Sequence, residues 1–304
     1  MIGLFLSFPF LLLGAGFAFG WYKFGQIPRT PVAAALSPIT GASTNILIVG
    51  TDSREGIDAS DPNSGAFIGE AVSGSRTDSI MVLHVEGDKQ SLLSIPRDLW
   101  VKDPKNNQMG RINATYTAGA PNLIKAVQNL GIPVHHYVEI NFVSFGKLVD
   151  AVGGIDVDFA NRTRDTNSGL YIDNPGVNHL DGTQALAYVR SRHFTEFKNG
   201  KWVEDPLSDL SRVQRQRTFL TALMNKVTDT KNPVELSSIT SALSVGMKID
   251  DAMNFLDALK LGWKLKGFHP ESISLPTSPA TKNGAEVLEL KPADAKPILD
   301  AMKS

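Results

Sequence analysis

Short runs of apolar residues recur along the chain and predict β-strands. The first covers residues 46–49 and ends at Gly50. Residues 80–85 and 92–95 follow, and Gly87-Asp88 lies between them. Two apolar runs joined by a glycine-containing turn are typical of a β-hairpin. Three further strands are predicted over residues 137–140, over residues 155–159 and near Ile273.

Between these runs, apolar positions recur at helical spacing. Residues 121–130 begin with Pro121 and are followed by Gly131, the usual start and stop of a helix. Asp181 and Gln184 match a capping box that opens another helix. Further helices are predicted over residues 142–152, 207–227 and 250–266. Strands that alternate with helices in this way predict an α/β sandwich.

The N-terminal residues 2–22 carry no charge, and a run of this length is enough to span a bilayer as a helix. Trp21 and Tyr22 end the run, where aromatic residues favour the membrane interface. We therefore predict a transmembrane anchor over residues 1–24. The alternative is a cleaved signal peptide, although no clear small-x-small cleavage site comes directly after Tyr22.

The orientation of this anchor is not simple to predict. Lys23 and Arg29 follow the apolar run and no basic residue precedes it, so the positive-inside rule alone places the rest of the chain in the cytoplasm. For the opposite orientation, either the true start lies upstream with a basic stretch, or the orientation is set by something other than this rule. Proline-rich residues 25–44 are predicted to be a linker, and residues 45–304 the globular domain.

Composition excludes several classes of function. The net charge is −1 over 304 residues, so no global basic field favours nucleic acid as a partner. The chain has no cysteine, which excludes disulfides and thiolate metal sites. The sequence contains neither a G-x-S-x-G elbow nor a Walker-type phosphate loop. Any anion site must therefore be local.

Arginines concentrate in one such local region. Arg190 and Arg192 would point the same way on an extended segment, while Arg212 and Gln216 would share one face of a helix. Guanidinium groups match phosphate oxygens in a planar fork, so a convergence of several predicts a pyrophosphate site. The alternative for any such pair is a salt-bridged surface.

Three polar clusters adjoin predicted strands, at residues 50–54, 75–78 and 94–98. Ligands of open α/β sheets usually bind at strand ends of this kind. Asp52 and Asp78 are suited to hold one Mg²⁺, with phosphate oxygens completing its shell. Taken singly, an aspartate beside a strand is more often a turn or cap residue.

In their order along the chain, these clusters resemble the LytR-CpsA-Psr family of cell-envelope phosphotransferases. The resemblance covers about residues 45–230. Its matching blocks are Asn45-Ile-Leu-Ile-Val-Gly50-Thr-Asp52-Ser-Arg54, Ser75-Arg76-Thr-Asp78, Ser94-Ile-Pro-Arg97-Asp98, Arg111-Ile-Asn113, Val152-Gly-Gly154-Ile-Asp-Val157, Leu180-Asp-Gly-Thr-Gln-Ala-Leu186-Ala-Tyr-Val-Arg190-Ser-Arg192 and Asp209-x-x-Arg212-x-x-Arg215-Gln216. Arg111 replaces a lysine common in the family, and the loop between Asp52 and Asp78 is longer than usual.

The resemblance implies both fold and function. It implies an α/β/α sandwich around a central mixed sheet, with a motif-bearing core at residues 45–230, a C-terminal extension at 231–304, and an apolar cavity for a polyprenyl chain. It implies transfer of a glycopolymer from a polyprenyl-pyrophosphate carrier onto peptidoglycan, outside the membrane, with Mg²⁺ as cofactor and Mn²⁺ as the alternative ion.

The resemblance also assigns site residues. It places the metal on Asp52 and Asp78. It places the pyrophosphate on a set of arginines and one glutamine, namely Arg76, Arg97, Arg190, Arg192, Arg212 and Gln216. A carboxylate, Asp52 or Asp98, is expected to take the proton of the acceptor. Hydrolysis of the same carrier and non-catalytic binding of anionic glycans stay as alternatives, and the polymer could be teichoic acid, capsule or arabinogalactan.

Overall fold

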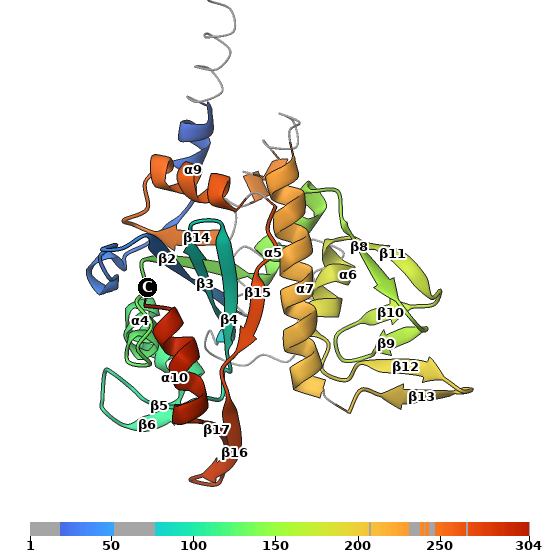
Figure 1. Cartoon of the computed structure of the whole chain (residues 1–304). Coiled ribbons are helices and arrows are strands. Elements are labelled where there is room, and N and C mark those ends of the chain that lie inside the picture. The colour runs from blue at the N-terminus through green and yellow to red at the C-terminus, as the bar shows by residue number, and fades with distance from the viewer. Residues whose placement is uncertain are drawn as a thin grey trace, which may run out of the picture.

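The structure is a computed structural model that describes residues 19–51, 77–206, 208–230, 238–239, 241–242, 247–265 and 267–303. Its centre is a seven-stranded sheet in the order β1-β14-β7-β2-β3-β4-β15 (Figure 1). These strands are β1 (Arg29–Thr30), β2 (Ser43–Thr51), β3 (Thr77–Glu86), β4 (Lys89–Ile95), β7 (His136–Asn141), β14 (Met247–Asp250) and β15 (Glu271–Ser274). The sheet is mixed: β2 pairs in parallel with β7 but antiparallel with β3.

Helices cover both faces of this sheet, which confirms the α/β/α sandwich. One layer contains α4 (Ala120–Gln128) and α10 (Pro292–Ala301), whose apolar residues join the largest core cluster. The other contains α7 (Ser208–Asp229) and α9 (Phe255–Lys264), which pack on a second cluster. Apolar side chains alternate along β2, where Leu47 and Val49 face the first layer and Ile46 faces the second. This alternation is the period of two that a strand imposes.

A smaller unit adjoins the sandwich, with its own cluster of buried apolar residues (Figure 1). Its helices are α5 (Phe142–Ala151) and α6 (Gly182–Arg190). Its strands are β8 (Ile155–Phe159), β9 (Thr163–Asp165), β10 (Leu170–Ile172), β11 (Gly176–Leu180), β12 (Thr195–Lys198) and β13 (Lys201–Glu204). Phe219 and Leu223 of α7 join this cluster, so α7 stands between the two parts.

Several short elements complete the fold. They are η1 (Ala33–Ala35), β5 (Trp100–Lys102), β6 (Met109–Arg111), α3 (Ile112–Thr115), η2 (Tyr116–Ala118), β16 (Thr277–Lys282) and β17 (Ala285–Leu290). Sequence patterns did not predict these elements, nor the strands of the smaller unit after β8. Each is a short element, for which apolar periodicity gives little signal.

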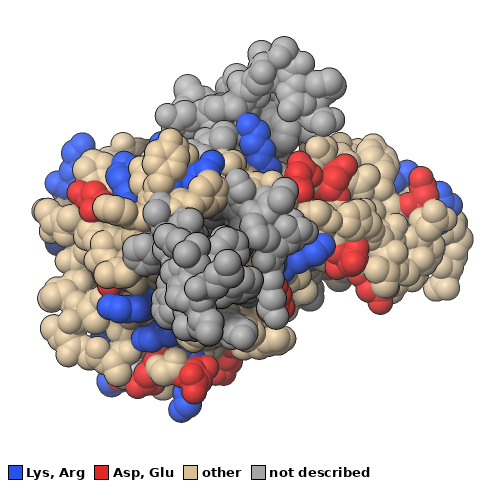
Figure 2. All heavy atoms as spheres, turned by 90° about the horizontal axis from the view of Figure 1, so that it is seen from above, with Lys and Arg blue, Asp and Glu red and all other residues tan. Residues whose placement is uncertain are grey.

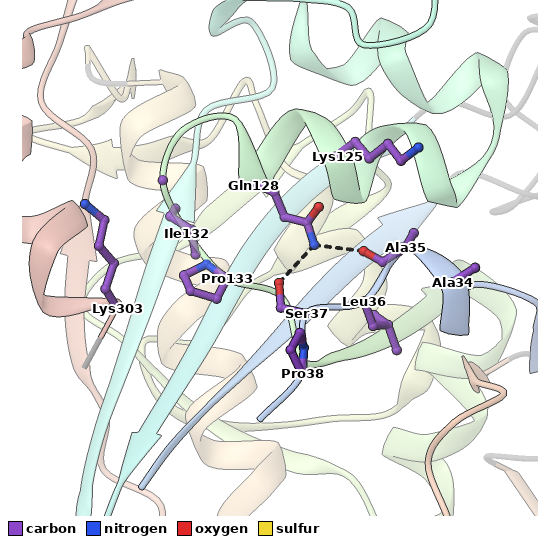
Figure 3. Close-up of a pocket in the computed structure, with 11 residues that line it drawn as sticks. Ala34, Ala35, Leu36, Ser37, Pro38, Lys125, Gln128, Ile132, Pro133 and Lys303 are labelled. Atoms are coloured by element: carbon purple, nitrogen blue, oxygen red, sulfur yellow. Dashed lines mark hydrogen bonds between the residues drawn. The ribbon is translucent and has the colours of Figure 1, made fainter. Parts of the chain in front are cut away.

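The proline-rich stretch from residue 25 to 44 contributes to the folded domain. Within it, β1 pairs in parallel with β14, and Val32 is buried in the main core. Gln128 of α4 fixes the following turn, because its Nε2 donates to the Ala35 carbonyl at 2.8 Å and to Ser37 Oγ at 3.1 Å (Figure 3).

A hollow of about 630 Å³ lies beside these contacts and is lined also by Lys125 and Lys303 (Figure 3). It adjoins the segments that precede β2 and β7, at the sheet edge opposite the strand ends that carry the predicted site.

The predicted membrane anchor falls mainly on residues 1–18, which lie outside the described residues. Residues 19–24 are helical. None of the helices that the structure describes has the length and apolar character needed to cross a bilayer.

Candidate active site

Part of the predicted site adjoins one edge of the central sheet. β4 is antiparallel to β3, which is antiparallel to β2, so the carboxyl ends of β2 and β4 and the start of β3 share this edge. Arg97 lies two residues after the end of β4, and Asp78 is the second residue of β3. Thr51, the last residue of β2, pairs with Thr77. The register therefore places Thr51, the residue before Asp52, beside Thr77, the residue before Asp78.

The structure describes the residues of the predicted metal site in part. Asp52 and Arg76 lie outside the described residues, and only the backbones of Asp78 and Arg212 are described. The described residues contain no group of three or more His, Asp or Glu side chains that could hold a metal ion. Asp78 belongs to β3, and Asp52 comes one residue after β2 in the sequence. Carboxylate oxygens are the ligands that Mg²⁺ takes, and it takes few of them, so the donor chemistry of these two residues fits this ion.

Asp98 organises two arginines beside β4. Its Oδ2 accepts a hydrogen bond from Arg97 Nε at 3.4 Å, and its Oδ1 forms an ion pair with Arg111 Nε at 3.3 Å. Arg111 also donates from Nη2 to the carbonyl of Glu286 at 2.6 Å. Both carboxylate oxygens of Asp98 therefore face guanidinium nitrogens.

The C-terminal extension closes over this part of the site. The Leu288 N–H of β17 donates to the Asp98 carbonyl at 3.0 Å. A hollow of about 430 Å³ lies between Asp98 and the β16–β17 hairpin. Sequence analysis did not predict that the extension contributes to the site. A backbone hydrogen bond from a hairpin far along the chain requires no particular side chain, so no sequence motif indicates it.

Arg190 and Arg192 lie at the C-terminal end of α6, the helix that the capping box at Asp181 predicted. Arg190 is the last residue of α6, and Ser191 is the C-cap with φ −56° and ψ 121°. The helix continues this far because Ala185, Leu186 and other residues of its apolar face pack in the smaller core. Both arginines are half-buried.

The turn after Arg190 is held by a buried carboxylate, Asp165 of β9. Its Oδ2 accepts hydrogen bonds from Ser191 Oγ at 2.7 Å, from the Arg192 N–H at 3.0 Å and from the His193 N–H at 2.9 Å. Burial raises the pKa of the Asp165 carboxyl, but hydrogen bonds from Ser191 and from the backbone N–H groups of His193, Asn167 and Ser168 together lower it below its ordinary value. Sequence analysis missed Asp165, since a single aspartate in a short strand carries no recognisable motif.

Arg215 and Gln216 tie α7 to the end of α6. Arg215 Nη2 donates to the Ser191 carbonyl at 2.7 Å, and its guanidinium lies 4.4 Å from the centre of the Phe194 ring. Gln216 Nε2 donates to the Val189 carbonyl at 3.2 Å. Arg215 is not one of the apolar positions that predicted this helix, yet it is buried, and burial lowers its pKa.

The next residue, Arg217, ties α7 to the sheet. Its Nε donates to Ser94 Oγ at 2.7 Å, and its Nη2 donates to the Ile273 carbonyl at 2.6 Å and to Ser274 Oγ at 2.7 Å. Adjacent residues of α7 thus connect the end of α6 to the end of β4. The only sequence signal for Arg217 is its place in the run Arg215-Gln216-Arg217.

This arrangement is suited to bind a multiply charged anion. Two half-buried arginines at the end of α6 are connected through α7 to β4, which Arg97 follows. The contacts of Asp165, Arg215 and Arg217 are made within the protein, so the arginine-bearing backbone is fixed before any ligand arrives. A backbone that is already ordered loses little conformational freedom on binding, which favours electrostatic stabilisation of a reacting phosphate by the arginines that it carries.

Known proteins resemble this chain in sequence and in fold. The sequence profile of the LytR_cpsA_psr family matches residues 28–304. The probable cell wall biosynthesis protein LcpB of Corynebacterium glutamicum is 36% identical over 209 residues, which is 68% of this chain and 46% of that protein. The chain therefore spans about half the length of this relative.

Two further relatives agree with this assignment. The polyisoprenyl-teichoic acid–peptidoglycan teichoic acid transferase TagU of Enterococcus faecalis is 34% identical over 193 residues, which is 62% of this chain and 59% of that protein. The structure of a LytR-Csp2A-Psr enzyme from Actinomyces oris has a TM-score of 0.71 and 25% identity, covering 91% of this chain and 95% of its own. Sequence profile, relatives and fold agree: this chain belongs to the LytR-CpsA-Psr family.

Proposed function

We propose that this protein transfers a glycopolymer from a polyprenyl-pyrophosphate carrier onto peptidoglycan and forms a phosphodiester link. The observation that carries the proposal is the fixed arrangement of Arg190 and Arg192 on the turn that Asp165 and Arg215 hold. Helix α7 connects this turn to β4, because Arg217 of α7 donates to Ser94 of β4. Arg97 lies shortly after the end of that strand. The relative TagU is named as a teichoic acid transferase, which supports the same class of reaction.

In the proposed reaction, a hydroxyl oxygen of peptidoglycan attacks the phosphorus that carries the glycan. The bond from this phosphorus to the bridging oxygen breaks, and polyprenyl phosphate leaves with the electron pair. The hydroxyl proton passes to a carboxylate, Asp52 or Asp98. The guanidinium groups of Arg97, Arg190 and Arg192 bind the non-bridging oxygens and neutralise charge that builds up on them.

Three further site residues complete the proposal. Arg76 and Arg212 add positive charge to the pyrophosphate site, and Gln216 holds the end of α6. Asp52 and Asp78 would hold Mg²⁺, which when bound neutralises charge on the pyrophosphate; Mn²⁺ is the alternative ion. In this proposal the N-terminal run anchors the protein, and residues 45–304 lie outside the cytoplasm.

One assay separates the proposed reaction from its two alternatives. Purified protein is given a carrier labelled in the glycan, with and without peptidoglycan. We expect the label to move to peptidoglycan in a Mg²⁺-dependent reaction. Release of soluble labelled glycan phosphate without peptidoglycan would indicate hydrolysis, and label that stays on the carrier would indicate binding alone.

A variant pair assigns the metal role within that assay. Asp78→Asn keeps the side-chain shape but loses the charge that holds a hard cation, so it should lose transfer. Asp158→Asn changes an exposed aspartate of β8, outside the site, and should keep it. Equal activity of both variants would remove the metal role from Asp78.

Topology is tested by a reporter at the C-terminus. Alkaline phosphatase fused after Ser304 should be active, since it folds only outside the cytoplasm. An inactive phosphatase together with a bright cytoplasmic fluorophore at the same position would reverse the orientation.

A further inference from the structure

Helix α9 has apolar side chains on two opposite faces. Ala258 and Leu261 belong to its inner face and pack on core clusters of the domain. Leu256, Leu259 and Trp263 are exposed by 54%, 47% and 83%. At 100° per residue these three lie on one face, opposite the inner one. The outward face of a surface helix normally carries polar residues, so the exposed apolar residues of α9 indicate that another surface covers this face.

A second exposed apolar group lies beside α9, on the helical residues 19–24. The two helices touch, because the rings of Phe24 and Phe255 are 5.6 Å apart and a Cβ at Gly20 would lie 3.2 Å from Phe255. Phe19, Trp21 and Tyr22 are exposed by 47%, 64% and 66%. In the described part of the chain, these two helices thus carry six of the eleven exposed large apolar residues.

The surrounding charges and the chain before Phe19 indicate what covers this surface. Lys260 and Lys264 are exposed on α9, and Lys23 lies on the adjoining helix. Figure 2 looks down on the end of the molecule where α9 lies and shows Lys and Arg atoms scattered over this face, together with Asp and Glu atoms. The sequence before Phe19 is uncharged back to residue 2 and long enough to enter a bilayer. Tryptophan and tyrosine rimmed by lysines match the interface of an anionic membrane.

We propose that α9 and residues 19–24 form a lipid-contact surface that lies in the interface of an anionic bilayer. Trp263, Leu259 and Leu256 enter the level of the headgroups, and Lys260 and Lys264 face lipid phosphates. The contact fixes the catalytic domain against the membrane at a second point besides the N-terminus. It adds to the proposed function and does not depend on which acceptor the enzyme uses.

Site-specific fluorescence tests this contact in the full-length protein. The chain has no cysteine, so single cysteines can be introduced as Leu259→Cys, Trp263→Cys and, as control, Val177→Cys. Val177 of β11 is exposed by 73% and lies in the smaller unit. Each cysteine carries an environment-sensitive fluorophore, and the protein is placed in phosphatidylglycerol-containing vesicles.

We expect the probes at positions 259 and 263 to be quenched several-fold more than the probe at 177 by nitroxide-labelled lipid, and less by aqueous iodide. Equal lipid quenching at 263 and 177 would overturn the proposal. Protection from iodide at 263 without lipid quenching would overturn it as well, and would indicate a protein partner such as a second copy of the chain.

A charge substitution supplies a second test. Leu259→Glu places a carboxylate among anionic headgroups and should remove most lipid quenching of the probe at 263, whereas Val177→Glu should leave it unchanged. Unchanged quenching in Leu259→Glu would contradict the contact. Both exposed sites tolerate a polar residue, and the fluorescence readout is independent of transfer, so failure of the proposed activity would leave this result unaffected.

Discussion

At the scale of single residues, the arginines near the site divide by burial. Arg215 and Arg217 are buried, and their guanidinium groups donate to carbonyl and hydroxyl oxygens of neighbouring elements. Arg97, Arg190 and Arg192 are half-buried at the edge of the sheet and on the turn after α6. The buried pair therefore supports the backbone, and the half-buried arginines are placed to meet a ligand.

This division predicts opposite effects of the same substitution. Arg190→Lys and Arg192→Lys should each lower the transfer rate by roughly ten- to a hundred-fold, because lysine cannot make a two-pronged contact worth about 1.5–3 kcal/mol. Arg215→Lys should instead lower the melting temperature. Transfer rate and melting temperature are measured on the same preparations, with the exposed Arg162→Lys as control. Less stable but fully active variants at 190 and 192 would assign both arginines a structural role.

Asp165→Asn should loosen the turn that carries Arg192. The amide group would present a donor where the carboxylate now accepts from Ser191, Arg192 and His193. We expect the free energy of unfolding to fall by about 1.5–3 kcal/mol and the transfer rate to fall with it. Denaturant unfolding measures the first, and Asp158→Asn, at an exposed site, should stay within about 0.5 kcal/mol of the wild type.

The same substitution has a pH signature. The folded-state pKa of Asp165 is lowered, so its contribution to stability is present above the unfolded pKa of about 3.9 and is lost as pH falls through the folded value. The stability difference between the wild type and Asp165→Asn should therefore shrink in acid. A difference that stays constant from neutral pH to about pH 2 would mean that the charge of Asp165 contributes nothing.

At the scale of elements, the position of α6 depends on its contact with α5. The Gly182 N–H donates to Asp150 Oδ1 at 2.7 Å, and a Cβ at Gly182 would collide with the carbonyl oxygen of Gly146. Asp181 caps the same helix by accepting from the Gln184 N–H at 2.8 Å, as the sequence predicted. The end of α6 carries Arg190, so this contact also places the site.

Gly182→Ala should therefore destabilise the protein by roughly 1–3 kcal/mol, the usual cost of an extra group at a packed contact. Gly262→Ala is the matched control, since a Cβ at Gly262 of α9 meets open space. It should be neutral or stabilise by up to about 1 kcal/mol, because alanine favours a helix. Chemical denaturation of both variants measures the difference, and similar values would show that α5 and α6 can separate without cost.

At the scale of the whole molecule, buried histidines link remote segments. His84 Nδ1 lies 2.7 Å from Asn45 Oδ1, and His135 Nδ1 accepts from the Asn45 N–H at 2.8 Å. Asn45 also donates from Nδ2 to the carbonyl of Met302, at the C-terminal end of the chain. Burial lowers the pKa of His84 and of His135, against a smaller opposing effect of Glu86 on His84.

These lowered pKa values predict acid destabilisation. The unfolded chain takes up protons at about pH 6.5 while the folded one does not, so stability should fall as pH drops below that value. The slope should reach about 1.4 kcal/mol per pH unit for each histidine that stays neutral in the folded state. Urea unfolding between pH 8 and pH 5 measures it. His193→Gln, which changes an exposed histidine, should keep the slope, and a flat profile in the wild type would contradict the prediction.

The sequence by itself predicted much of the sandwich. The apolar runs that became β2, β3, β4, β7 and β8, the hairpin at Gly87 and the helices α4, α5 and α7 were read from periodicity, because each buries one face in a core. The family also followed from the order of short motifs, and the profile over residues 28–304 confirms it. These patterns depend on residues that are close together along the chain, so they can be recognised from the sequence alone.

Tertiary structure alone decided what holds the site together. The carboxylate of Asp165 and the carbonyl of Ile273 meet arginines far from them along the chain. The point at which α6 ends, at Arg190, depends on the packing of its apolar residues in the smaller core. These features arise from contacts between segments that are distant in sequence. Such contacts depend on how the layers pack, and residue spacing along the chain carries no record of that packing.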